Sequence, residues 1–64
     1  MSIAKKIQLY LIEKNIKQSW LSEETKISPA KLSSSFKGNR KLSVEEYQLI
    51  IKALKLDANK FMNK

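Results

Sequence analysis

The sequence predicts an all-α protein, a compact bundle of four to five short helices. Its 64 residues suffice for one domain only, so 1–64 is expected to fold as a single unit. Apolar residues make up 42% of the chain, enough for one thin core and too many for a disordered tail. One glycine and one proline provide too few turn residues for an all-β chain.

The first two helices are predicted from their apolar periodicity. One is expected from Ser2, as N-cap, to Lys14, with Asn15 in the left-handed conformation that ends many helices. Its apolar side chains follow the spacing of one helical face: Ile3, Ile7, Tyr10 and Leu11. The second is expected over 18–25, with Trp20 half-buried beside the inward residues Leu21, Ser22 and Thr25. Trp20 could stack on a base, but packing is the preferred interpretation.

The third helix has the clearest start signal of the chain. Ser28 can cap its first turn, and Pro29 at the first helical position loses no hydrogen bond. The helix is expected to reach about Lys37 and to end at Gly38. Its inward residues are Ile27, Leu32 and either Ser35 or Phe36. Its outward face is nearly bare of bulk and consists of Pro29, Ala30, Ser33, Ser34 and Lys37.

A capping box predicts the start of the fourth helix, because Ser43 is followed three residues later by Glu46. The buried stripe of this helix is expected to be Val44, Tyr47, Ile50, Ile51 and Leu54. Asp57 is expected to cap a last short helical turn over about 58–62.

The charge balance indicates an anionic partner. Thirteen basic residues face six acidic ones, a net charge of +7, and residues 17–41 carry +4 of it (six basic, two acidic). Such a region suits nucleic acid first and an anionic membrane second. The alternative is that the lysines only keep a small domain soluble.

Several classes of function are excluded by composition. Without cysteine or histidine the chain has no disulfide, thiolate, imidazole base or common zinc site. Ser33, Ser34 and Ser35 near Lys31 could imitate a Ser–Lys nucleophile, but no glycine-rich oxyanion loop accompanies them. We therefore expect no enzyme, and no cofactor, metal or small-molecule ligand.

No targeting signal is apparent either. The apolar run 7–12 is interrupted by Gln8, lacks a following cleavage site and is too short to span a bilayer. We expect a cytoplasmic protein that does not bind membranes.

Two short helices over about 18–37, joined by a tight turn and followed by a basic loop, indicate a helix-turn-helix. Residues 16–61 resemble the lambda-repressor-like family of Cro and cI type. The positions that carry the resemblance are Gln18, Leu21, Ser22, Ile27, Leu32, Ser33, Gly38, Ser43, Ala53, Leu54 and Asp57. Two features depart from the family. Lys26 stands where the turn usually has glycine, and Leu11 with Phe36 stands where many members pair Arg with Glu, so we expect a hydrophobic contact there.

The resemblance implies a sequence-specific binder of double-stranded DNA, a small phage- or plasmid-type transcriptional regulator that represses. Its third helix would enter the major groove. The expected base-reading residues are Pro29, Ala30, Ser33, Ser34 and Arg40, the last reaching a guanine or a phosphate. The expected phosphate-binding residues are Gln18, Ser28, Lys31, Lys37, Asn39, Lys41 and Ser43.

Two further interpretations concern protein partners. A homodimer is expected through an apolar patch of Leu49, Leu56, Phe61 and Met62, which would place two reading helices one turn of DNA apart. The alternative for Phe61 is that it only closes the core. The alternative for the whole chain is a protein-binding module, of antitoxin or anti-restriction type, that keeps the fold without strong DNA recognition.

Overall fold

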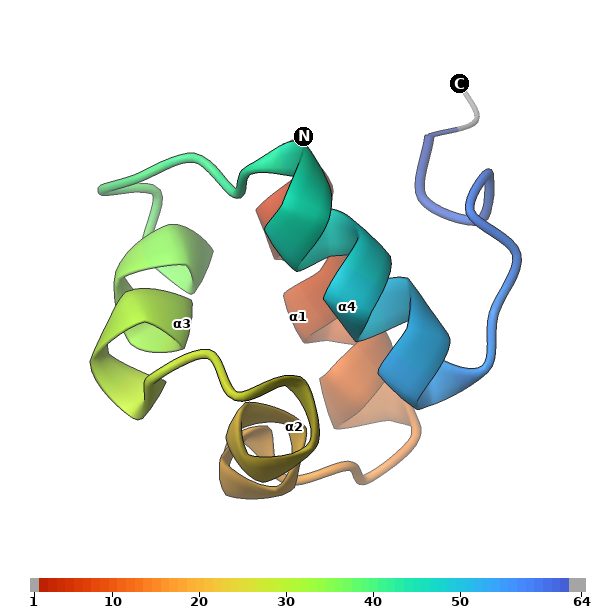
Figure 1. The fold of residues 1–64 in the computed structure, drawn as a ribbon, viewed down its shortest axis with the longest axis horizontal. Coiled ribbons are helices and arrows are strands. Elements are labelled where there is room, and N and C mark those ends of the chain that lie inside the picture. The colour runs from red at the N-terminus through yellow and green to blue at the C-terminus, as the bar shows by residue number, and fades with distance from the viewer. Residues whose placement is uncertain (1, 63–64) are drawn as a thin grey trace.

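A computed structural model describes residues 2–62, and within that range it contains four α-helices and no strand. The helices are α1 (Ile3–Glu13), α2 (Gln18–Thr25), α3 (Pro29–Phe36) and α4 (Val44–Leu54). In Figure 1, α4 crosses in front of α1, while α2 and α3 lie below and to the side of that pair. The all-α class is therefore confirmed. Over residues 2–62, no helix has the length and apolar character needed to cross a membrane.

Three of the four described helices, α1, α3 and α4, begin at a serine whose side chain caps the first turn, whereas Lys17 before α2 makes no such bond. The hydroxyl of Ser2 accepts from the Lys5 N–H at 3.1 Å, and that of Ser28 from the Lys31 N–H at 3.2 Å. At α4, Ser43 Oγ accepts from the Glu46 N–H at 3.1 Å while the Glu46 carboxylate accepts from the Ser43 N–H at 2.9 Å. Each of these bonds satisfies an N–H that the helix itself leaves unpaired.

One core joins the four helices. Ile7, Leu21, Leu32 and Ile50 are completely buried, and α2 packs against α3 and α4 while α1 packs against α3. Leu11 and Phe36 are 3% and 2% exposed and belong to this same core. Both Ser35 and Phe36 are buried, so neither faces outward.

The prediction that Val44 belongs to the buried stripe is wrong. Val44 is 73% exposed, whereas Tyr47, Ile50 and Ile51 are buried and Leu54 is partly buried. Val44 is the first residue of α4, so it lies at the end of the helix, beyond the part that packs on the core.

The expected fifth helix is replaced by turns over residues 58–62. Asp57 does accept a hydrogen bond from the Asn59 N–H at 2.7 Å, but no helix follows. The segment is instead held by Tyr47, whose hydroxyl donates to the Ala58 carbonyl at 2.6 Å, and by Phe61. The Phe61 ring is 5% exposed and stands edge-on to Tyr10, with ring centres 5.6 Å apart. Phe61 therefore closes the core, and its expected place in an exposed dimer patch is corrected.

Three non-glycine residues take a left-handed conformation at helix ends. Their φ angles are 57° for Asn15, 64° for Lys26 and 57° for Lys55. Gly38, after α3, has a φ of 87°. A side chain in this conformation costs about 1 kcal/mol, so the turn between α2 and α3 keeps its tight geometry at a cost that glycine would avoid.

Candidate nucleic-acid interface

The outward side of α3 carries mostly small side chains, and all of them are at least partly exposed. Pro29, Ala30 and Lys37 are exposed, and Ser33 and Ser34 are partly exposed. We call these five residues the α3 face. Because only one of them has a long side chain, another surface can come close to the backbone of this helix.

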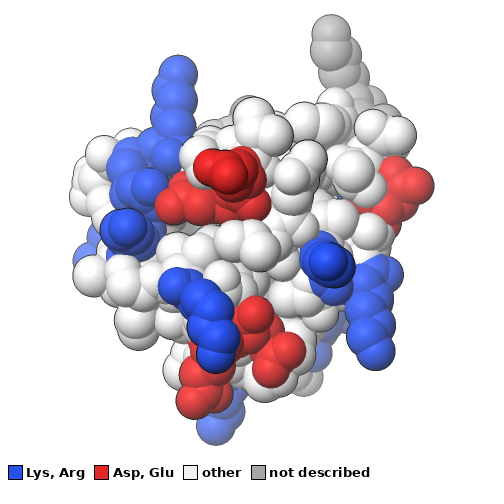
Figure 2. All heavy atoms as spheres, in the orientation of Figure 1, with Lys and Arg blue, Asp and Glu red and all other residues white. Residues whose placement is uncertain are grey.

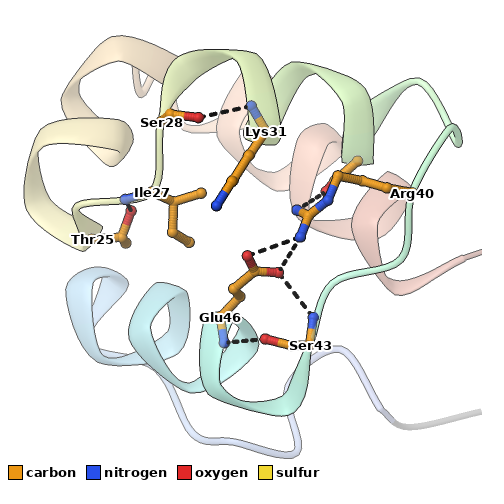
Figure 3. Close-up of polar contacts among 8 residues, drawn as sticks. Thr25, Ile27, Ser28, Lys31, Arg40, Ser43 and Glu46 are labelled. Carbon is orange, nitrogen blue, oxygen red and sulfur yellow. Dashed lines mark hydrogen bonds and ion pairs between the residues drawn. The ribbon is translucent and has the colours of Figure 1, made fainter.

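Buried hydrogen bonds fix α3 relative to α2. Ser22 Oγ donates to the carbonyl of Ile27, beyond the turn, at 2.6 Å. Thr25 Oγ1 donates to the Leu21 carbonyl at 2.7 Å. It also accepts from the Ile27 N–H at 3.3 Å (Figure 3). The sequence predicted that Ser22 and Thr25 face inward. It did not predict that these hydroxyls hold the backbone that leads into α3.

Cationic side chains surround the α3 face. In Figure 2, basic residues gather over α3 and the loop that follows it, at the left of the view. Lys31, Lys37, Asn39 and Lys41 are exposed. Gln18 is partly exposed at the start of α2. Among the other residues expected to bind phosphate, Ser28 and Ser43 already use their hydroxyls as helix caps.

Arg40 is turned inward. Its Nη1 donates to Ser35 Oγ at 3.0 Å, and its Nη2 donates to the two carboxylate oxygens of Glu46 at 3.1 and 3.0 Å. Figure 3 shows the guanidinium between α3 and the start of α4. A bidentate contact to guanine needs such a pair of N–H donors, and here they are engaged within the chain. Arg40 therefore has a role in the fold, and its expected contact with a guanine or a phosphate stays a prediction.

Glu46 is the centre of this polar cluster. The Ser43 N–H lowers the pKa of its carboxyl most, and Arg40 lowers it further, while burial works in the opposite direction. Lys31 also lowers this pKa through its charge, and in Figure 3 its ammonium points toward Glu46. Lys31, one of the lysines expected to bind phosphate, thus lies near the carboxylate of Glu46. The ion pair between Arg40 and Glu46 was hard to predict from the sequence, since only the capping box singles out Glu46.

The expected dimer patch is divided. Leu49 and Met62 are 44% and 55% exposed, whereas Leu56 is partly buried and Phe61 belongs to the core. Met62 borders a hollow of about 440 Å³, together with Ile3, Leu42 and Val44. Leu49 borders a different hollow on the outer side of α4. The two exposed residues therefore do not form one continuous patch.

Comparisons with known proteins give no further assignment. No protein-family model, curated protein or solved structure matches this chain. Within residues 2–62, no group of three or more acidic side chains lies in an arrangement that could hold a metal ion.

Proposed function

We propose that the chain is a sequence-specific binder of double-stranded DNA, a small transcriptional repressor in which α2 and α3 act as a helix-turn-helix. The observation that carries this proposal is the α3 face: mostly small side chains along the outward side of α3, bordered by cationic residues. A major groove about 12 Å wide admits an α-helix, and small side chains allow close approach to base edges. Such a regulator acts on DNA in the cytoplasm and carries out no catalysis.

Within this proposal four residues of the α3 face read the bases: Pro29, Ala30, Ser33 and Ser34. The hydroxyls of Ser33 and Ser34 can donate or accept hydrogen bonds, and the methyl group of Ala30 suits that of thymine. Lys37, Asn39 and Lys41 would contact phosphates and give most of the affinity. Since α3 carries no Asn, Gln or Arg, direct readout is weak and the shape of the DNA supplies part of the specificity.

Selection of bound sequences from random duplex DNA tests the proposal, followed by binding measurements over a range of salt concentrations. Lys37→Ala should weaken binding to all sequences and reduce the salt slope by about one. Ser34→Ala should change base preference and leave the slope unchanged. Lys52→Ala, at an exposed position of α4, is the matched control for Lys37→Ala and should leave the affinity and the salt slope nearly unchanged. If the α3 variants bind as the wild type does, α3 is not the reading helix.

We also propose that two copies bind together, through the hollow that Met62 and Val44 border. A two-fold pair with reading helices about 34 Å apart would place both in successive major grooves. Sedimentation of Met62→Lys and Leu49→Lys, with and without DNA, distinguishes the two hollows. Loss of the dimer in Met62→Lys alone supports the proposal, and loss in Leu49→Lys alone contradicts it.

The alternative is a protein-binding module with the same helices. The engaged guanidinium of Arg40 favours it, because the single arginine of the chain already uses N–H groups on Ser35 and Glu46 that a contact with DNA would need. The salt series separates the two functions. Affinity for DNA falls steeply with salt, whereas an apolar protein interface is little affected. Failure to select any duplex would favour the protein-binding function.

A further inference from the structure

The loop between α3 and α4 has few hydrogen bonds of its own. Its first part continues the end of α3, where the Gly38 N–H donates to the Ser35 carbonyl at 3.1 Å and the Asn39 N–H to the Ser34 carbonyl at 2.9 Å. From there to the capping box at Ser43, the described hydrogen bonds to the rest of the protein come from the side chain of Arg40, while Leu42 packs against the core.

Those bonds connect three elements. Ser35 belongs to α3 and is 1% exposed, so its hydroxyl is a fixed point of the core. Glu46 belongs to the first turn of α4 and is fixed in turn by the capping box. The Arg40 guanidinium is planar and binds the carboxylate in two places, which restricts its orientation more than one contact would.

We propose that Arg40 is a positioning residue, which holds the loop 37–43 so that Lys37, Asn39 and Lys41 lie ready for the DNA backbone. The inference rests on the proposed function. It extends that function by giving a defined role to Arg40 and Glu46, neither of which touches DNA in this scheme. An ordered loop binds more tightly because no free energy is spent on selecting its bound conformation.

The direction in which one substitution changes the affinity for DNA tests this role of Arg40. Glu46 carries a negative charge next to a surface proposed to bind phosphates. By direct electrostatics, removing that charge should strengthen DNA binding. Under the positioning role, Glu46→Gln should weaken it, because Arg40 loses the negative charge and the two-point contact and keeps only its bond to Ser35 intact. Glutamine also serves at this position of a capping box, so the start of α4 is retained.

Arg40→Lys gives the second contrast. It keeps the positive charge and loses the two-point contact with Glu46. A direct phosphate contact predicts that binding is largely retained, whereas positioning predicts a loss similar to that of Glu46→Gln. Glu45→Gln is the matched control, since Glu45 is exposed and lies in the same first turn of α4.

The experiment measures the affinity of wild type, Glu46→Gln, Arg40→Lys and Glu45→Gln for a mixed-sequence DNA duplex, after thermal unfolding has shown that each is folded. If the ordered loop falls to a tenth of its population, Glu46→Gln and Arg40→Lys each bind about tenfold more weakly, with unchanged salt slopes. Glu45→Gln binds at least as tightly as wild type. Tighter binding by Glu46→Gln, or full retention by Arg40→Lys, overturns the inference.

A measurement without DNA separates the positioning role from the proposed function. Amide hydrogen exchange over residues 38–43 should be faster in Glu46→Gln and Arg40→Lys than in wild type, with α1 unchanged. Unchanged exchange in the loop overturns the inference even if the protein binds DNA. Faster exchange in a protein that binds no DNA supports the hold on the loop and contradicts the DNA function.

Discussion

The longer helices, α1 and α4, and the shorter helices, α2 and α3, contribute different kinds of contact to the core. α1 and α4 have 11 residues each, and their buried residues are apolar apart from the hydroxyl of Tyr47. α2 and α3 have 8 residues each, and half of their buried residues are polar: Ser22, Thr25 and Ser35. The longer pair provides a scaffold, and the shorter pair presents the α3 face.

The difference has a physical meaning. Burial of apolar area is not directional, so the contacts of α1 with the core leave some freedom of position. Hydrogen bonds act over a narrow range of distance and angle. A short helix that depends on them has little freedom once it is docked. Directed bonds are therefore used where a surface must be presented precisely, and apolar burial where stability is needed.

The largest expected effect is at Phe36, where the two pairs of helices meet. Phe36→Ala should destabilise the fold by roughly 3–5 kcal/mol, because the ring is 2% exposed and its removal leaves a cavity. Thermal unfolding by circular dichroism measures the loss. Ile12→Ala is the control: Ile12 is 65% exposed, and its change should stay within about 0.5 kcal/mol. A heat-stable Phe36→Ala protein would contradict the place of this ring in the core.

The second largest effect is expected for the buried hydrogen bonds of α2 and α3. Ser22→Ala removes the donor of the 2.6 Å bond to the Ile27 carbonyl and should cost about 1–3 kcal/mol. Ser19→Ala, on the exposed side of the same helix, should change stability by less than about 0.5 kcal/mol. Equal stability of the two variants in urea would show that the bond across the turn adds nothing.

A gain in stability is expected at the turn. Lys26→Gly should stabilise the protein by up to about 1 kcal/mol, because glycine adopts a φ of 64° without strain. Lys37→Gly is the matched control. Lys37 also ends a helix but has a φ of −81°, so glycine there should destabilise by about 0.5–1 kcal/mol. If both substitutions act in the same direction, the left-handed turn stores no strain.

The smallest expected effect is on the pH dependence of stability. The pKa of Glu46 is lowered from 4.5 in the folded protein, chiefly by the Ser43 N–H and then by Arg40. Between the two values the unfolded chain binds the proton and the folded protein does not, so stability is lost as the pH falls from about 4.5 through the lowered pKa. Thermal unfolding below pH 5 should show a shallower loss in Glu46→Gln. An identical loss in both proteins would show that Glu46 contributes nothing to acid unfolding.

What could be predicted from the sequence was local. Ser28 with Pro29, and Ser43 with Glu46, predicted the starts of α3 and α4 correctly, because a cap involves atoms within three residues. The apolar period also predicted the buried residues Ile7, Leu11, Tyr47, Ile50 and Ile51, but it missed Ala4 and wrongly included Val44. Periodicity assigns a residue to a face, but it cannot tell whether the end of that face still overlaps the core.

What could not be predicted depends on contacts across loops. Arg40 lies in a basic loop, and nothing in its neighbours indicates that it folds back onto Ser35 and Glu46. Phe61 was one of several apolar residues near the end of the sequence, and only the packing of its ring on Tyr10 decides between core and surface. The base-reading and phosphate-binding roles remain predictions that the DNA measurements test.

The packing of Phe61 has a consequence for the order in which the protein folds. Among the packed helix pairs, α2 and α3 are neighbours along the chain and meet across a short turn, while α2 with α4 and α1 with α3 are each separated by one helix. The segment at 57–62 instead closes over α1, where the Lys6 ammonium donates to the Phe61 carbonyl across 55 positions. Closing so long a loop costs entropy, so we expect this segment to dock last and open first. Each opening would briefly expose Tyr10 and the core beneath it, which makes this segment the natural starting point of unfolding.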